Sequence, residues 1–171
     1  MIKFNRVWAM PNKNTFSIKP VKELLSRYVD KENQIWIDPF ANSSKIATVT
    51  NDIDESYNTD YHLDVIEFLR LFEDNSVYGV LVDSPYSPRQ LSECYKKLNL
   101  SVTMETTQSS FWSRIKDEVA RIISPEGLAI TFGWNSNGIG KTRGFEILEI
   151  LLVAHGGNHN DTIVTVEKKT K

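Results

Sequence analysis

Short apolar runs alternate along the chain with segments whose apolar residues recur at helical spacing. The apolar and β-branched runs predict strands over residues 35–37, 46–50, 61–63, 77–82, 128–132, 145–154 and 162–166. The spaced segments predict helices over residues 21–28, 65–72, 89–98 and 109–123, with a surface loop at 101–108. Strands that alternate with helices are typical of a parallel sheet covered on both faces. The pattern therefore predicts an α/β fold, with residues 1–171 forming a single domain.

Composition narrows the class of protein. A chain of 171 residues with 40% hydrophobic residues is long enough to bury roughly 70% of its unfolded surface in one core. The single cysteine excludes an intramolecular disulfide and a cysteine-based zinc cluster, and we expect no metal site. No charged-then-apolar leader and no apolar run of 18 residues occur, so we expect a cytoplasmic protein without a membrane segment. The net charge of −2 means that a nucleic-acid partner would have to be held by local basic patches.

The most informative stretch follows the predicted strand at 77–82. This strand ends in Asp83, and the chain continues as Ser84-Pro85-Tyr86. Proline cannot continue strand pairing, and an acid beside an aromatic ring is an unusual way to end a buried strand. Ligands of open α/β sheets bind at the carboxyl ends of the strands. We therefore predict a functional site at residues 83–86.

Acids also follow the three preceding predicted strands. Asp38 comes after residues 35–37, Asp52 after 46–50 and Asp64 after 61–63. For any one of them, a helix cap or a solvated turn is the simpler interpretation. Four acids at four successive strand ends favour a shared crevice at that edge of the sheet.

Three motifs of the sequence resemble those of a known family. The Asp83-Ser84-Pro85-Tyr86 segment resembles the Asp-Pro-Pro-Tyr signature of amino-group methyltransferases, especially those that act on adenine N6. Residues 38–44, Asp-Pro-Phe-Ala-Asn-Ser-Ser, resemble the Asp-Pro-Phe-Ala-Gly-Ser-Gly cofactor loop of these enzymes, and residues 16–20 resemble their Phe-x-Ile-Lys-Pro segment. The resemblance covers most of the chain. In the order of these motifs, the chain is similar to small adenine-specific DNA methyltransferases carried by phages and prophages. Such an enzyme would act in the host cytoplasm.

The resemblance implies a fold and a cofactor. The fold is a Rossmann-like class I methyltransferase sheet, mostly parallel, of about seven strands, with residues 145–154 and 162–166 as a C-terminal antiparallel hairpin. The cofactor is S-adenosylmethionine, with Asp52 on the ribose, Ile53 against the adenine and Asp64 on the adenine amine. The full set of expected cofactor-binding residues is Lys19, Asp38, Pro39, Phe40, Ala41, Asp52, Ile53, Asp64 and Val65. For residues 16–20, a core-packed Phe16 ahead of a helix that starts at Pro20 is an equally good interpretation.

The resemblance also implies a mechanism. An adenine amine is a poor nucleophile because its lone pair is delocalised into the ring. Hydrogen-bond acceptors for its two N–H groups favour the localised lone pair. We assign the Asp83 carboxylate and the Ser84 carbonyl as these acceptors, and Pro85 holds the Ser84 carbonyl in place. Tyr86 would stack on a base taken out of its helix, a contact worth about 1–3 kcal/mol.

Few residues are available to recognise the target. We expect the base pocket or nearby phosphates to be contacted by Arg89, Trp134, Asn135, Lys141 and Arg143. These few cations would give weak, salt-sensitive binding to DNA. Either the enzyme reads little sequence, or a second subunit, another copy or a different protein, supplies target recognition. Residues 135–142 also look like a phosphate loop, but Asn135 stands where the first glycine is required.

Three departures from the family pattern leave alternatives open. Ser84 replaces the first proline of the signature, and Asn42 and Ser44 replace the two glycines of the cofactor loop. Asparagine tolerates left-handed backbone conformations, although glycine allows closer approach to a ligand. The alternatives are a catalytically impaired cofactor-binding module, serving as a decoy or partner subunit, or the same chemistry on RNA or a protein amide.

Overall fold

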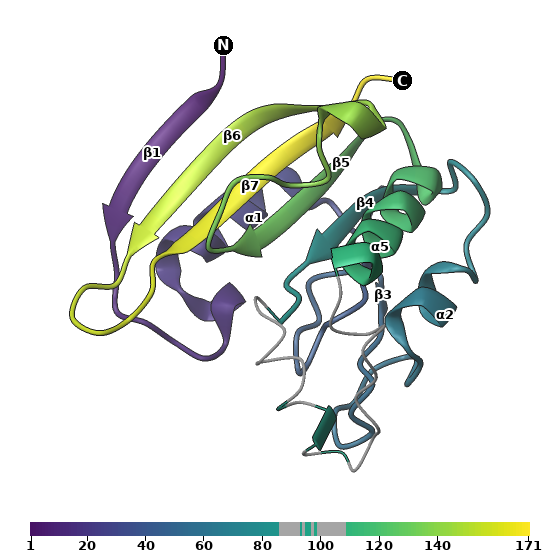
Figure 1. Cartoon of the computed structure of the whole chain (residues 1–171), viewed down its shortest axis with the longest axis horizontal. Coiled ribbons are helices and arrows are strands. Elements are labelled where there is room, and N and C mark those ends of the chain that lie inside the picture. Colours follow the sequence, from purple (N-terminus) through teal and green to yellow (C-terminus); the bar gives the residue numbers. More distant parts are fainter. Residues whose placement is uncertain (86–92, 94, 97, 99–108) are drawn as a thin grey trace.

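A seven-stranded mixed sheet forms the centre of the computed structural model (Figure 1). Residues 86–92, 94, 97 and 99–108 are not described by the structure, and all other residues are. Across the sheet the strands are β1 (Lys3–Trp8), β6 (Phe145–Ala154), β7 (Thr162–Lys169), β5 (Ile123–Gly133), β4 (Val77–Val82), β2 (Trp36–Asp38) and β3 (Val49–Thr50). Strand β7 runs antiparallel to both neighbours, and the other neighbouring pairs are parallel. This confirms the predicted fold class and the antiparallel hairpin.

Helices lie on both faces of the sheet because the inner strands are apolar on both sides. The helix α1 (Lys19–Tyr28) packs with Leu81 of β4 on one face, together with the short turn η1 (Thr15–Ser17). The helices α2 (Val65–Leu69) and α5 (Ser109–Ile122) pack with Val80 and Val82 of β4 on the other face. Figure 1 shows α5 and α1 on opposite sides of the sheet. Among the described residues no helix is long and apolar enough to cross a bilayer.

Two strands differ from the prediction. The edge strand β1 was not predicted, because its two largest apolar side chains, Phe4 and Trp8, are exposed, whereas Lys3 and Asn5 bond the buried Glu149. The predicted strand at 61–63 is wrong, since this segment makes only an isolated bridge from Tyr61 to Asn51. The Asn51 side chain bonds the backbone N–H and C=O of Leu63, which replaces the ladder bonds of a neighbouring strand.

A buried carboxylate fastens β1 to the rest of the fold. Glu149 of β6 accepts hydrogen bonds from Lys3 and Asn5 of β1 and from Arg27 and Tyr28 of α1, the one from Arg27 at 2.6 Å. Burial raises the pKa of Tyr28 to about 12, with help from its hydrogen bond to Glu149. Burial opposes ionisation of Glu149, but the bonds from Tyr28 and Arg27 prevail and lower its pKa. The charged network replaces the apolar contacts that this end of β1 lacks.

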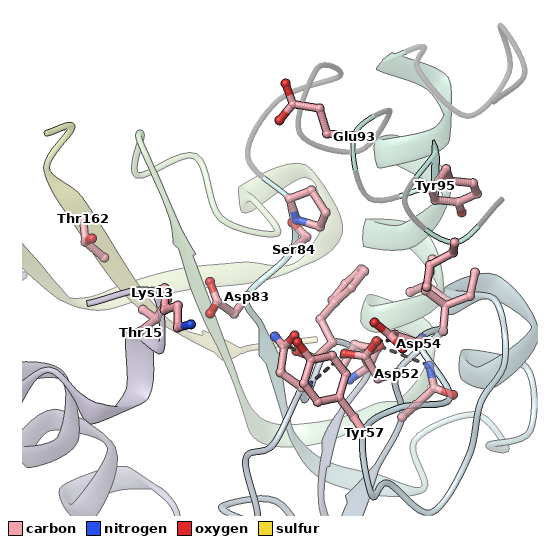
Figure 2. A pocket seen from close by; sticks show the side chains of 18 of the residues that line it. Lys13, Thr15, Asp52, Asp54, Tyr57, Asp83, Ser84, Glu93, Tyr95 and Thr162 are labelled. Atoms are coloured by element: carbon pink, nitrogen blue, oxygen red, sulfur yellow. Dashed lines mark hydrogen bonds between the residues drawn. The ribbon is translucent and has the colours of Figure 1, made fainter. Parts of the chain in front are cut away.

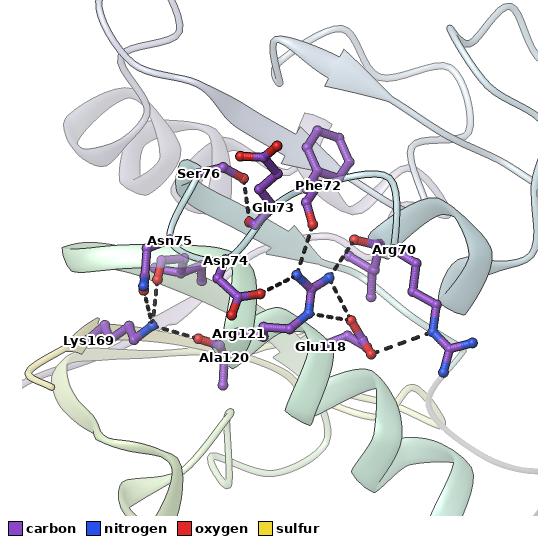
Figure 3. Close-up of polar contacts among 12 residues, drawn as sticks. Arg70, Phe72, Glu73, Asp74, Asn75, Ser76, Glu118, Ala120, Arg121 and Lys169 are labelled. Atoms are coloured by element: carbon purple, nitrogen blue, oxygen red, sulfur yellow. Dashed lines mark hydrogen bonds and ion pairs between the residues drawn. The ribbon is translucent and has the colours of Figure 1, made fainter.

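Two cationic side chains, Arg121 and Lys169, hold together the end of the sheet at which β4 and β5 begin (Figure 3). Arg121 of α5 donates to the backbone oxygens of Leu69 and Phe72 and pairs with Asp74 at 2.8 Å. The Lys169 ammonium of β7 donates to Asn75, Ala120 and Ile123 at 2.6–2.8 Å, and burial lowers its pKa. Because these contacts fix where β4 begins, they also fix where its carboxyl end points.

Candidate functional site

A cavity of about 840 Å³ lies at the carboxyl ends of β2, β3 and β4 (Figure 2). Its wall comes from the segment after β1, the strand ends, the start of α5 and the turn between β6 and β7. The predicted site residues that line it are Pro39, Phe40, Asp52, Ile53, Val65, Asp83, Ser84 and Pro85. The cavity therefore joins the two motifs that are 45 residues apart in the sequence, at Asp38 and Asp83.

The end of β4 brings Asp83 to the cavity. Strand β4 is buried from Val80 to Val82, and the chain leaves the sheet at Asp83, where half-buried Ser84 and Pro85 follow. In Figure 2, Asp83 lies between Lys13 and Thr15 on one side and Asp52 and Asp54 on the other. The predicted site residues Tyr86 and Arg89 lie outside the described residues.

Asp38 lies at the end of β2 and is fully buried. Its Oδ1 atom accepts the Phe40 N–H at 3.0 Å, whereas Oδ2 is buried with no hydrogen-bond partner. Burial raises the pKa of Asp38 well above its usual value, and the charges of Asp83 and Asp52 raise it further. A buried carboxylate oxygen without a partner is costly to keep, which is typical of a functional position.

The turn after β2 forms without glycine. Asn42 adopts a left-handed backbone with φ of 47°, the conformation for which the family pattern has glycine. The Asn42 N–H donates to Oδ2 of Asp52 at 2.8 Å, and the Asp54 N–H donates to Oδ1 at 2.9 Å. Burial raises the pKa of Asp52, although these two bonds oppose the rise. Asp52 thus holds the cavity wall together while also lining it.

Asn51 is a site residue that the sequence analysis missed. It is buried, and its amide group donates to the backbone oxygens of Pro39 and Leu63 and accepts the Leu63 N–H at 2.9 Å. Both Asn51 and Leu63 line the cavity. The only signal in the sequence was a polar residue at a strand end, since its partners are backbone groups from two other segments.

Asp64 is the cap of α2. Its Oδ1 atom accepts the Ile66 N–H at 2.9 Å, and its Oδ2 atom accepts from the Tyr95 hydroxyl at 3.2 Å. The neighbours Leu63 and Val65 line the cavity, but Asp64 does not. The helix-cap interpretation describes this residue better than a contact with an adenine amine.

Lys19 does not reach the cavity. It is the exposed first residue of α1, where it precedes Pro20. Phe16 is buried and packs against Phe132, with ring centroids 4.9 Å apart. The cavity is lined instead by Lys13 and Thr15, which come just before. The packing interpretation of residues 16–20 is therefore the one that the structure supports.

The loop between β5 and β6 also lies away from the cavity. None of Trp134, Asn135, Lys141 and Arg143 lines it. Lys141 and Arg143 form the turn η2 (Lys141–Arg143) just before β6 begins. Arg143 pairs with Asp117 of α5 at 2.6 Å.

The amides that a phosphate loop would use are already bonded. The Ile139 and Gly140 N–H groups donate to the Glu167 carboxylate at 2.6 and 3.0 Å. Glu167 lies in β7, and a side chain at Gly138, where φ is 54°, would run into its carboxylate. This loop is built to pack on the sheet.

The charged side chains that line the cavity are mostly acidic. Its lining includes Asp52, Asp54, Asp83 and Glu93, and Lys13 is the only lysine or arginine among the described residues that line it. Apolar walls come from Phe40, Ile53 and Phe111, among others. A cationic ligand with an apolar part suits this site better than a polyanion does.

Comparison with known proteins gives similarity at the level of the fold. No protein-family model matches the sequence, and no curated protein matches it. A chain of the complex between the Haloferax volcanii Trm112 methyltransferase activator and the putative methyltransferase aligns with a TM-score of 0.60. The identity is 13%, and the alignment covers 92% of this chain and 90% of that one.

Two further solved structures are similar. The Burkholderia thailandensis 1,6-didemethyltoxoflavin-N1-methyltransferase, with bound 1,6-didemethyltoxoflavin and S-adenosylhomocysteine, has a TM-score of 0.55 and 8% identity over 81% of this chain and 72% of that one. TrmN from Thermus thermophilus has a TM-score of 0.54 and 16% identity over 89% of this chain. The chain spans about half the length of TrmN, at 49%. The protein thus has the Rossmann-like fold of these methyltransferases.

Proposed function

We propose that the protein is an S-adenosylmethionine-dependent methyltransferase that acts on the exocyclic N6 amine of adenine in DNA. The observation that carries the proposal is that one cavity joins Pro39 and Phe40 at the end of β2 to Asp83, Ser84 and Pro85 at the end of β4. S-adenosylhomocysteine bound to the Burkholderia enzyme of the same fold supports the choice of cofactor.

The residues of the cavity fit this cofactor. When bound, S-adenosylmethionine supplies an electrophilic methyl group on a positively charged sulfur. The acids that line the cavity favour such a cation, and Phe40, Ile53 and Val65 provide apolar surface for an adenine ring. Asp52 keeps lone pairs available for ribose hydroxyls beside its two backbone bonds. Lys13, and not the expected Lys19, lines the cavity, where its ammonium group would contact the carboxylate of the cofactor.

The end of β4 holds the amine that receives the methyl group. The Asp83 carboxylate and the Ser84 carbonyl accept its two N–H bonds, which localises the nitrogen lone pair. The nitrogen would take the methyl group as its bond to the sulfonium sulfur breaks, and would lose one proton, which the Asp83 carboxylate would accept. The ring of Pro85 fixes its own φ angle, and this restricts the backbone next to the Ser84 carbonyl. Stacking of Tyr86 on the base remains a prediction from the sequence.

Methyl transfer with product identification tests the proposal. Calorimetry measures binding of S-adenosylmethionine, and tritium transfer is then measured on unmethylated DNA and RNA, with digestion and mass identification of the methylated nucleoside. We expect N6-methyladenine from DNA. Cofactor binding without transfer to DNA, RNA or protein would identify a noncatalytic module, and N6-methyladenine from RNA alone would reassign the substrate.

A partner subunit is part of the proposal. The Haloferax structure is a complex between a methyltransferase activator and the putative methyltransferase. The cations predicted in the loop between β5 and β6 do not line the cavity of this chain. A second subunit that supplies target recognition would raise transfer on DNA when it is added to the assay.

The affinity for S-adenosylmethionine should rise with pH. Because burial and neighbouring acids raise the pKa of Asp38, this group is protonated over a pH range in which ordinary carboxyls are ionised. A bound cation favours the ionised form, so binding releases a proton and tightens as pH rises through the raised pKa. Calorimetry at several values between about pH 5 and 8, in buffers of different ionisation enthalpy, measures this release.

The matched control for this prediction is Asp38→Asn. The amide keeps an oxygen for the Phe40 N–H but has no titrating proton. The variant should bind the cofactor more weakly and lose most of the pH dependence. Unchanged pH dependence in Asp38→Asn would assign the proton to another group.

A further inference from the structure

An aromatic and cationic ridge runs along the outer strand of the sheet. Strand β1 lies at the edge and pairs with β6 on one side only (Figure 1). Phe4 and Trp8 are 60% and 64% exposed, and Arg6 between them is exposed as well. Side chains at alternate strand positions point to the same face, so these three residues share one face. We call Phe4, Arg6 and Trp8 the β1 ridge.

The β1 ridge faces away from α1. Lys3 and Asn5 of the same strand point to the other face, where they bond Glu149, and Val7 packs there in the cluster that includes α1. In the described part of the chain, α5 packs over β4 and β5 and leaves the β1 ridge uncovered. Glu149 therefore anchors the strand from behind while its aromatic side chains stay exposed.

The segment that carries the ridge is the basic part of an otherwise acidic chain. Residues 1–22 contain five lysines and arginines and no aspartate or glutamate, although the whole chain has a net charge of −2. Of these five, Arg6 lies on the ridge and Lys13 follows it, whereas the other three lie on the Glu149 side or in α1. Neither Arg6 nor Lys13 makes an ion pair with any residue that the structure describes. Such a local excess of positive charge attracts a polyanion, whereas the acidic cavity repels phosphates.

The ridge leads directly to the mouth of the cavity. Trp8 is paired with Ala154, and the next residue, Ala9, donates its N–H to the Ala154 oxygen at 3.1 Å. The Ala9 oxygen lies 2.9 Å from Nδ1 of His155, which lines the cavity. Lys13, four residues further on, is part of the cavity wall as well. A strand bound along the β1 ridge would therefore arrive at the cavity.

We infer that the β1 ridge binds a single-stranded stretch of nucleic acid next to the target base. Phe4 and Trp8 stack on unpaired bases, and Arg6 contacts a phosphate between them, as in other sheet-based readers of single strands. The two rings are four strand positions apart, about 13 Å. This inference rests on the proposed function, since it assigns the flanking substrate to the same site.

A second copy of the chain suits the β1 ridge less well. A twofold interface places the same surface patch against itself. Pairing of β1 with its own copy would bring the exposed Arg6 side chains of two strands to one interface, and like charges across an interface are repulsive. The charge therefore favours a polyanion over self-association.

Binding of a labelled single strand of about 12 nucleotides tests the inference. Fluorescence anisotropy measures the affinity of the protein for this strand in DNA and RNA form. The double variant Phe4→Ala/Trp8→Ala should weaken binding at least about 30-fold, because each lost stacking contact costs about 5-fold or more. Arg6→Gln should reduce the slope of log affinity against log salt by about 0.7, the value for one phosphate contact on a single strand.

Matched controls separate a local effect from general ones. Leu71→Ala removes an equally exposed apolar side chain outside the ridge, and Lys171→Gln removes an exposed charge at the other end of the chain. Both should bind the single strand as wild type does. Because the ridge side chains are exposed, we expect the thermal stability of their variants to stay within about 2 °C of wild type.

The outcomes distinguish this inference from the proposed function. Wild-type affinity in the double variant overturns the inference, and so does absence of single-strand binding by the wild type. Sedimentation that shows a dimer dissociated by the double variant also overturns it, because the ridge is then an interface between copies. Binding of S-adenosylmethionine, measured by calorimetry, does not depend on the ridge. If the wild type does not bind this cofactor, the result refutes the proposed function and leaves the measured single-strand binding as it is.

Discussion

Asp83→Ala is expected to reduce methyl transfer by about 10²–10³-fold while changing the affinity for S-adenosylmethionine only a few-fold. Loss of one preorganised group that stabilises charge in a transition state has this typical cost. Asp83 leaves the sheet at the end of β4 and lines the cavity, where it would accept an N–H bond of the amine. Single-turnover tritium transfer measures the rate, and calorimetry measures the affinity.

The contrast between rate and affinity is what tests the role of Asp83. If the affinity falls as steeply as the rate, Asp83 holds the cofactor and the assignment to the amine is wrong. Glu73→Ala removes an exposed carboxylate that does not line the cavity and should leave both quantities unchanged. Comparison with this control separates a specific effect from a change in net charge.

Gly79→Ala is expected to destabilise the fold by about 3 kcal/mol or more, which is a fall of roughly 6–10 °C in melting temperature. A side-chain carbon at this position in β4 would overlap the ring of Trp36 in β2. Trp36 is fully buried, so its ring cannot move aside cheaply. Thermal unfolding followed by circular dichroism measures the change.

Two companion variants make the Gly79 prediction specific. Gly133→Ala adds the same carbon in β5, where it meets no atom within 4 Å, and should change the stability by less than about 0.5 kcal/mol. Trp36→Leu opens the space beside Gly79 at its own cost, so the double variant with Gly79→Ala should be less destabilised than the two single losses added together. Strict additivity would show that the Trp36 ring is not the obstacle.

The core of the sheet could be predicted because its signals are local. The buried run from Val77 to Val82 predicts an inner strand whatever surrounds it, and six of the seven predicted strands overlap observed ones, the exception being the segment at 61–63. The hairpin of β6 and β7 is confirmed as well. In contrast, β1 became a strand because Glu149, 146 residues from Lys3, offers a buried charge for its polar face.

The candidate site was only partly predictable for the same reason. An acid at a strand end can be recognised from neighbouring residues, and Asp38, Asp52 and Asp83 all lie at or next to the cavity. Whether Asp64 binds a ligand or caps a helix depends on which N–H group it meets, here that of Ile66. Likewise Arg143 has Asp117 within reach only after α5 has packed on the sheet.

Local sequence thus established the α/β class, the sites where strands end and the acids placed there, because these depend on the residue types of one short segment. Folding decided which of those segments meet. It brought Lys13 instead of Lys19 to the cavity, used Asn51 to join its walls, and left Phe4 and Trp8 exposed on an edge strand. The physical reason is that burial and hydrogen bonding across distant segments depend on strand order, which no short stretch of sequence encodes.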